Sequence, residues 1–176
     1  MDLANRPLAP EPYDLLPPVP SFTVESDDFV AGGALAAKFG GDAGNHSPHL
    51  RWSGFPEETK SFLINVFDPD APTPAGFWHW TIVDLAPHVT ELEGNVGESD
   101  DALPGEAFHV RSDGGKAAYA GPYPPDGDRP HRYVFAVHAL DIDSLGLDPD
   151  ASPTAVAFNA LFHTIARGTL TGTYQR

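Results

Sequence analysis

Three runs of β-branched and aromatic residues restrict the fold of this chain more than any other feature. They cover residues 61–67, 77–85 and 131–141 and are dense in Val, Ile, Phe, Trp and Tyr. Such runs, bounded by turn-forming residues, are typical of buried strands. The 19 prolines and 17 glycines among 176 residues indicate many turns and long loops. The sequence therefore predicts a mainly β fold, and shorter runs predict weaker strands at 22–29, 50–52, 107–111 and 169–174.

One helix is predicted near residues 152–167. Ser152 is a natural N-cap and Pro153 suits the first helical position. Arg167 and Gly168 are residue types that often end a helix. Apolar residues at helical spacing predict one buried stripe along it, made of Phe158, Leu161, Phe162 and Ile165.

The chain divides into an arm and a domain. Residues 1–20 are proline-rich, which predicts an extended arm that packs on the domain or frays. Residues 21–176 then form a single domain, because a chain of this length fits one core. The sequence shows neither a signal-peptide pattern nor an apolar run long enough to span a bilayer, so we expect a cytoplasmic protein with no integral membrane segment.

Charge and cysteine content exclude several classes of function. The formal net charge is −15, from 10 Lys and Arg against 25 Asp and Glu, and this field disfavours nucleic acids and anionic membranes. A local anion site stays possible because surface charges are screened over short distances. The absence of cysteine excludes disulfides, thiol nucleophiles and Cys-based metal sites.

An acidic elbow, Asp68-Pro69-Asp70-Ala71-Pro72, follows the first strong strand. Prolines fix the backbone around its two carboxylates and make it stiff. Spacing alone favours a plain turn in which the aspartates cap backbone N–H groups. The alternative is a pocket wall, and both can hold if Asp70 or Asp68 is structural and the other faces a ligand.

His79 lies in the second strong strand among aromatic residues. Strand alternation predicts that it shares one face with Phe77 and Thr81, and that Trp78 and Trp80 share the opposite face. A single histidine in such a strand is more often a core residue than a ligand group. Both interpretations stay open.

The segment before the third strong strand is rigid and poor in donors. Its prolines carry no N–H, so the N–H groups of Gly121 and Tyr123 are candidate anion donors, although a polyproline connector or SH3-type ligand is an alternative. In the strand itself, His131 can donate to a ligand oxygen and Arg132 can pair with a nearby Asp.

Metal binding and catalysis have less support. Asp68, Asp70, His79 and His131 are acceptable ligand types, but no pair has a tight metal-binding spacing. Neither a G-x-S-x-G elbow nor a phosphate-binding loop is present. We therefore expect no metal, no cofactor and no catalytic residue, with a weak hydrolase based on Asp70 and a His79-activated water as a minor alternative.

Each of five motifs is weak by itself, but their order along the chain is specific enough to indicate a protein family. The succession resembles the phosphatidylethanolamine-binding protein family, which includes Raf kinase inhibitor proteins and plant flowering-time regulators, and is most similar to its bacterial and archaeal branch. The resemblance covers residues 20–175. It rests on Ser47-Pro-His-Leu-Arg-Trp52, Asp68-Pro-Asp-Ala-Pro72, Phe77-Trp-His-Trp80, Gly121-Pro-Tyr-Pro-Pro125 and His131-Arg-Tyr133.

This resemblance implies a Greek-key β-sandwich with a few peripheral helices and a small anion pocket near the surface. Two departures stand out: Tyr123 occupies a position that is often Cys in prokaryotic members, and residues 108–115 diverge from the expected pattern. Carried over by motif, the implied ligand-binding residues are Asp68, Asp70, Ala71, Pro72, His79, Gly121, Tyr123, Pro124, His131 and Tyr133.

The expected function is binding of phosphate or a phosphoethanolamine head group. His79 and His131 would donate to the anion, one aspartate would orient a histidine, and the other would receive an ammonium. The alternative from another class is a protein-interaction module that inhibits a kinase or a protease. The bacterial branch also implies a homodimer.

Overall fold

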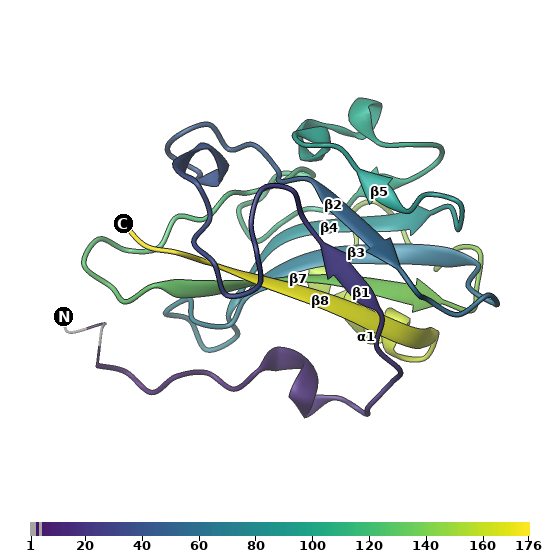
Figure 1. Cartoon of the computed structure of the whole chain (residues 1–176), viewed down its shortest axis with the longest axis horizontal. Coiled ribbons are helices and arrows are strands. Elements are labelled where there is room, and N and C mark those ends of the chain that lie inside the picture. The colour runs from purple at the N-terminus through teal and green to yellow at the C-terminus, as the bar shows by residue number, and fades with distance from the viewer. Residues whose placement is uncertain (1–2, 4) are drawn as a thin grey trace.

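Two antiparallel sheets make up the computed structural model, which describes residue 3 and residues 5–176 (Figure 1). Met1, Asp2 and Ala4 of the predicted arm lie outside the described residues. The larger sheet has the order β6-β4-β3-β7-β8 and the smaller has the order β1-β2-β5. The strands are β1 (Thr23–Glu25), β2 (Leu50–Ser53), β3 (Ser61–Asp68), β4 (Phe77–Leu85), β5 (Glu91–Leu92), β6 (Phe108–His109), β7 (His131–Leu140) and β8 (Thr164–Tyr174).

The main core lies between the sheets and confirms the predicted strong strands. Alternate residues of β3 and β7 point into it, as expected for strands with one face on the core. Large fully buried side chains fill it, among them Phe62, Ile64, Trp80, Tyr133 and Phe135. The fold is therefore the mainly β sandwich that the sequence predicts.

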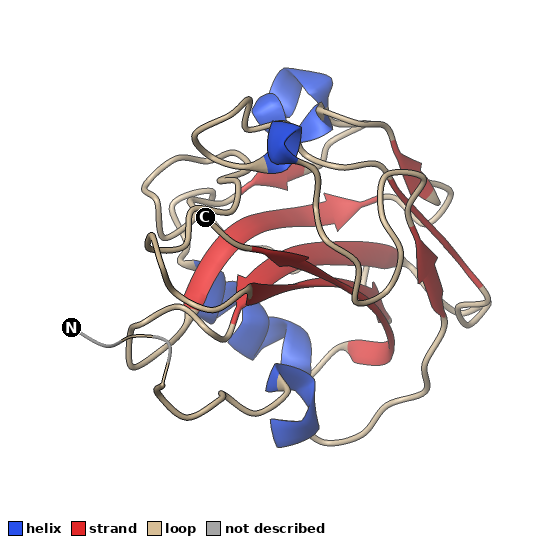
Figure 2. Ribbon diagram, turned by 60° about the vertical axis from the view of Figure 1, so that its left-hand side comes forward, coloured by secondary structure: helices blue, strands red, loops and turns tan. Residues whose placement is uncertain are grey.

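Helices are short and peripheral. The α-helix α1 (Pro153–Leu161) packs on the outer face of the larger sheet through Val156 and Ala160. Figure 2 shows helical ribbon beneath this sheet, on the side away from the smaller one. The 3-10 segments are η1 (Pro12–Leu15), η2 (Ala37–Phe39), η3 (Val96–Glu98) and η4 (Asp100–Ala102).

The structure confirms the start of the predicted helix and corrects its end. The Ser152 side chain accepts a hydrogen bond from Ala155 N, as an N-cap should. The helix ends at Leu161, and Arg167 belongs to β8, which pairs along the length of β7. The predicted buried stripe is wrong, since Phe158 and Phe162 are 63% and 68% exposed. Pairing with β7 outweighs a local helical periodicity, because tertiary contacts override weak propensity.

A β-bulge at His79 corrects the predicted faces of β4. Val66 and Phe67 are consecutive in β3, yet they pair with Trp80 and Trp78, so His79 is an extra residue in β4. Trp80 enters the core between the sheets, whereas Trp78 contacts Phe67 on the outer face. The two tryptophans thus lie on opposite faces, because a bulge shifts the side-chain alternation by one residue.

Candidate functional site

A cavity of about 360 Å³ lies at the end of the larger sheet where β3 ends and β4 and β7 begin. The loops at residues 71–73 and 120–125 form its sides. Nine of the ten predicted ligand-binding residues line it: Asp68, Ala71, Pro72, His79, Gly121, Tyr123, Pro124, His131 and Tyr133. Sequence reasoning missed the remaining lining residues, Thr73, Phe77, Gly114, Ala120 and Pro125. Of these, Phe77 had a usable signal, because it shares the expected strand face with His79.

Asp68 is buried and has a role in the turn and in the cavity. Its Oδ1 accepts a hydrogen bond from Asp70 N at 2.7 Å, which caps the acidic elbow. Its Oδ2 accepts from His131 Nδ1 at 2.7 Å and lies 4.0 Å from His79 Nε2. The Asp68 carboxylate therefore both caps the turn and forms part of the cavity wall.

Asp70 does not line this cavity, although the family motif predicts it as a ligand residue. Its Oδ2 accepts from Arg132 Nε at 2.7 Å and from Arg132 N at 3.0 Å, and its Oδ1 accepts from Arg132 Nη2 at 2.8 Å. The predicted pairing of Arg132 with an aspartate is confirmed. Burial works against ionisation of Asp70, but these donors hold its pKa below the ordinary value. Asp70 therefore anchors the elbow to β7.

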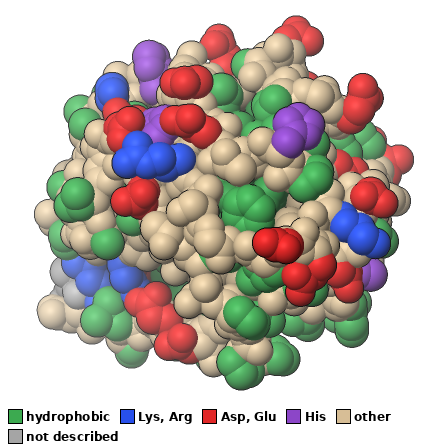
Figure 3. All heavy atoms as spheres, turned by 45° about the vertical axis from the view of Figure 1, so that its right-hand side comes forward, with side chains coloured by type: hydrophobic (Ala, Val, Ile, Leu, Met, Phe, Trp, Pro, Cys, Tyr) green, Lys and Arg blue, Asp and Glu red, His purple; other side chains and the backbone are tan. Residues whose placement is uncertain are grey.

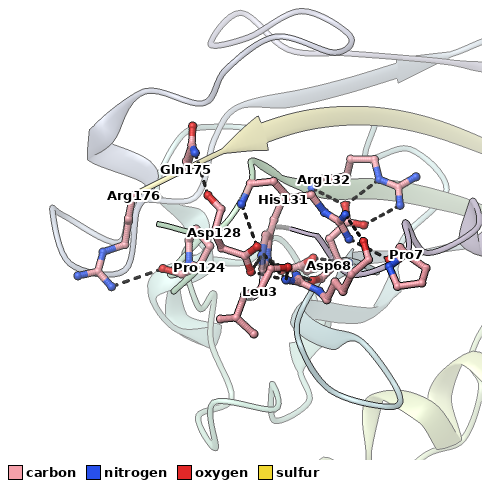
Figure 4. Close-up of polar contacts among 12 residues, drawn as sticks. Leu3, Pro7, Asp68, Pro124, Asp128, His131, Arg132, Gln175 and Arg176 are labelled. Atoms are coloured by element: carbon pink, nitrogen blue, oxygen red, sulfur yellow. Dashed lines mark hydrogen bonds and ion pairs between the residues drawn. The ribbon is translucent and has the colours of Figure 1, made fainter. Parts of the chain in front are cut away.

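His131 lies between two carboxylates (Figure 4). Its Nδ1 is 2.7 Å from Asp68 Oδ2, and its Nε2 is 3.0 Å from Asp128 Oδ2. Burial opposes the charge, but the hydrogen bonds to Asp68 and Asp128 raise the pKa of His131 above its ordinary value. Both ring nitrogens are already occupied. His131 is therefore placed to orient Asp68 and not to donate to a ligand, contrary to the expectation from sequence.

Asp128 is a buried residue of this cluster that sequence reasoning missed. Besides His131 it binds Arg6, whose Nη1 is 2.8 and 2.6 Å from the two Asp128 oxygens. Although burial opposes ionisation, hydrogen bonds from His131 and Arg6 bring the pKa of Asp128 down to about 2. Its only signal in the sequence is an acidic residue three positions before His131, which is too common a pattern to be diagnostic.

His79 keeps one ring nitrogen for a ligand. Its Nδ1 donates to the Ala120 carbonyl oxygen at 2.6 Å, and its ring meets Tyr133 edge-on at 5.0 Å between centroids. Burial lowers the pKa of His79, so the imidazole is neutral at neutral pH with a lone pair on Nε2. The nitrogen near Asp68 thus accepts in the neutral form and donates only when His79 is protonated.

The rim differs from expectation at Gly121. Its N–H donates to Asn45 Oδ1 at 2.7 Å, so it is already used and is not a free anion donor. Tyr123 is 58% exposed at the cavity mouth, and the Arg176 guanidinium lies 3.9 Å from its ring centroid. The Tyr133 hydroxyl is buried without a hydrogen-bond partner in the part of the chain that the structure describes.

Among residue 3 and residues 5–176, no group of three or more His, Asp or Glu side chains is arranged to hold a metal ion. Within the same residues, no helix has the length and apolar character needed to cross a membrane.

Comparisons with known proteins agree in one family. The family model described as phosphatidylethanolamine-binding protein matches residues 25–175. The Escherichia coli K12 protein YbhB is 43% identical over 135 residues, covering 77% of this chain and 85% of YbhB. The crystal structure of E. coli YbcL superimposes with a TM-score of 0.86 at 39% identity, covering 89% of this chain and 99% of YbcL. A carboxypeptidase Y inhibitor, solved in complex with its cognate proteinase, shares the fold at a TM-score of 0.53 and 18% identity, covering 89% and 84% of the two chains.

Proposed function

This chain belongs to the phosphatidylethanolamine-binding protein family, and from that premise we propose that its small cavity binds a zwitterionic phosphate ester of the phosphoethanolamine type. The observation that supports this most is the placement of Asp68 Oδ2 4.0 Å from His79 Nε2 at the cavity wall. One group is a carboxylate and the other becomes a donor on protonation. Both groups are buried, so each interacts more strongly with a charged ligand than it would in water.

Each of the two groups binds one charged end of the ligand. Asp68 receives the ammonium, because His131 and Asp70 N hold its oxygens in place and leave lone pairs on both. His79 receives the phosphate through Nε2–H. The cavity volume of about 360 Å³ suits a small head group, because it lies at the lower end of the roughly 300–1,000 Å³ that is typical of ligand pockets.

We expect His79→Ala to weaken phosphoethanolamine binding by about tenfold or more. The variant removes the charged donor, and a hydrogen bond to a charged group contributes roughly 1.5–3 kcal/mol. Isothermal titration calorimetry on both proteins measures the change. His88→Ala is the matched control, because His88 is exposed and outside the cavity lining. Equal affinity in wild type and His79→Ala would exclude this assignment.

Binding should also take up a proton. Burial lowers the pKa of His79 in the free protein, and a phosphate beside Nε2 raises it again, so binding favours protonation. Affinity should therefore rise as the pH falls from about 7.5 to about 5.5, in the region of the ordinary histidine pKa. Glycerophosphoethanolamine is the ligand to use, because its phosphodiester does not titrate there. Calorimetry in two buffers of different ionisation enthalpy gives the proton count, and zero uptake would contradict this role for His79.

The proposal describes binding and not catalysis. His79 and Asp68 provide acid–base groups, and among the described residues that line the cavity Thr73 is the one hydroxyl or amine side chain of the Ser, Thr or Lys type. Turnover of a phosphoester by wild type that is lost in His79→Ala would favour the hydrolase alternative. Cytoplasmic location and homodimer formation stay predictions.

A second candidate function is protein inhibition. The carboxypeptidase Y inhibitor is similar only in fold, but it shows that a chain of this fold can engage a proteinase. Exposed Tyr123 at the cavity mouth gives a contact point for a partner. Pull-downs with and without phosphoethanolamine separate the two functions: a partner that the ligand does not displace would favour inhibition.

A further inference from the structure

A second, larger cavity of about 600 Å³ lies on the outer face of the larger sheet. It runs between η1 of the N-terminal arm and α1, which lie on the same side of that sheet (Figure 2). We call this the outer groove. Its volume is within the roughly 300–1,000 Å³ typical of small-molecule sites. Its walls are mainly apolar, with contributions from Pro12, Leu15, Phe67, Trp78, Ala157 and Leu161.

The charged residues of the outer groove differ from those of the chain as a whole. The chain carries 25 acidic residues, and the face drawn in Figure 3 shows acidic side chains scattered among few basic ones. Yet none of the described residues that line the outer groove is Asp or Glu. Arg167 is the one Lys or Arg among these lining residues.

Arg167 is buried without a counter-ion. Its residue is 8% exposed, and no carboxylate in residue 3 or residues 5–176 forms an ion pair with it. The guanidinium carbon lies 4.5 Å from the Tyr13 ring centroid, and Nε donates to His138 Nδ1 at 3.2 Å. Arginine is seldom buried unless its charge is paired, so the buried Arg167 lacks the anionic partner that such a residue usually has.

His138 cannot supply the missing negative charge. Burial, and then the nearby Arg167 charge, bring the pKa of His138 down to about 3, so the imidazole is neutral at neutral pH. It accepts from Arg167 Nε and leaves the other guanidinium nitrogens without a protein acceptor in the described residues. These nitrogens belong to a residue that lines the outer groove.

The arm closes one side of the outer groove over this cation. Tyr13 Oη donates to Asn65 Oδ1 at 2.5 Å, and the Tyr13 ring meets His138 edge-on. Arg132 fixes the arm further along, because its Nη2 donates to the Ala9 carbonyl oxygen at 2.7 Å. The arm therefore forms a wall of the outer groove, and its Tyr13 ring stacks on the guanidinium.

We propose that the outer groove binds a medium-chain fatty acid, with its carboxylate on Arg167 and its alkyl chain along the apolar walls. A planar guanidinium suits a carboxylate because two parallel N–H donors match its two oxygens. One unpaired cation matches one monoanionic head. No described residue that lines the outer groove is Asp or Glu, so no carboxylate of these walls repels an anion bound there.

Dodecanoate, below its micelle concentration, is the probe. We expect calorimetry to show binding to wild type that weakens by about tenfold or more in Arg167→Gln, because the only charge-assisted contact is lost. Arg111→Gln is the control and should bind as wild type does, since Arg111 is exposed and outside the outer groove. Dodecan-1-ol, which has the same chain without the charge, should bind wild type as weakly as dodecanoate binds Arg167→Gln. Equal binding of the acid and the alcohol would overturn the proposal.

A second variant keeps the test decisive if Arg167→Gln folds poorly. Ala157→Trp fills the outer groove from α1 at a partly exposed position and leaves the Arg167 contacts in place. It should abolish dodecanoate binding while phosphoethanolamine binding, which uses the other cavity, stays at the wild-type level. Retained dodecanoate binding in this variant would overturn the proposal without affecting the proposed function.

Sedimentation of the same proteins tests a different occupant. Exposed apolar residues at the edges of the outer groove, Leu15 and Phe158, are suited to a second copy of the chain as well. If wild type is a dimer that Ala157→Trp dissociates, and dodecanoate does not bind wild type, a second copy covers the outer groove and the fatty-acid proposal is wrong.

Discussion

Asp70→Ala is expected to lower the free energy of unfolding by about 3 kcal/mol, in the range for breaking a buried ion pair by removing one partner. The variant removes the acceptor for three Arg132 donors at once, and both side chains are largely buried. Arg132 then keeps only the carboxylate of Glu11, an exposed residue of the arm, as its ion-pair partner among the described residues. Urea denaturation measures the loss. Asp70→Asn should lose less, because its amide oxygen still accepts one hydrogen bond.

The matched control for Asp70→Ala is Asp150→Ala. Asp150 also pairs with an arginine, Arg111, but both side chains are exposed and the distance is 3.4 Å. Exposed ion pairs contribute little to stability, so this variant should unfold as wild type does. If the two alanine variants were equally stable, the anchoring role of Asp70 would have to be abandoned.

The strong strands could be predicted from sequence because their content of apolar and β-branched residues is enough to identify them. A run such as Phe77–Leu85 is too apolar and too β-branched to be exposed, and its observed bounds agree with prediction. The end of α1 was harder. Ile165 and Arg167 fit a helical pattern locally, and only the ladder between β7 and β8 shows that they are strand residues. Long-range pairing leaves no local signal at these positions.

The order of motifs located the cavity, but it could not assign roles inside it. Asp68 and Asp70 look alike in the sequence, yet one lines the cavity and the other pairs with Arg132. His131 looks like a free donor until Asp128 is placed against its second nitrogen. Each role depends on partners that the fold brings together from more than 50 residues away or from a loop without regular structure, and spacing carries no information on them.

Arg6 links the arm to the cavity in a way that composition could not predict. Its guanidinium donates to both Asp128 oxygens and to the Asp70 carbonyl oxygen, so one arm residue contacts the two segments that hold Asp68 and His131. Figure 4 shows the resulting chain of polar contacts from the arm to His131. The proline-rich arm thus lines the outer groove through Tyr13, and through Arg6 it contacts Asp128, which holds His131 of the first cavity.

Gly121→Ala is expected to disturb both stability and ligand binding. A Cβ at this position would lie closer than 3.0 Å to three backbone atoms: Phe39 O, Gly41 N and Gly40 C. Backbone atoms cannot rotate away as a flexible side chain does, so the rim or residues 39–41 must move. Overpacking of this kind costs typically 1–3 kcal/mol, and we expect a loss of about 2 kcal/mol. The shift also breaks the Gly121 N–H bond to Asn45 and should weaken phosphoethanolamine binding by about tenfold.

Gly94→Ala is the control that separates this steric effect from the general effect of replacing glycine. A Cβ at Gly94 would meet only Ser47 O, at 3.8 Å, which is an ordinary contact. Gly94→Ala should therefore match or slightly exceed wild-type stability, because alanine lowers the entropy of the unfolded chain. Urea denaturation and calorimetry on both variants give the comparison. If Gly121→Ala behaved as Gly94→Ala does in both measurements, the close backbone contact at the rim would not be what shapes the cavity.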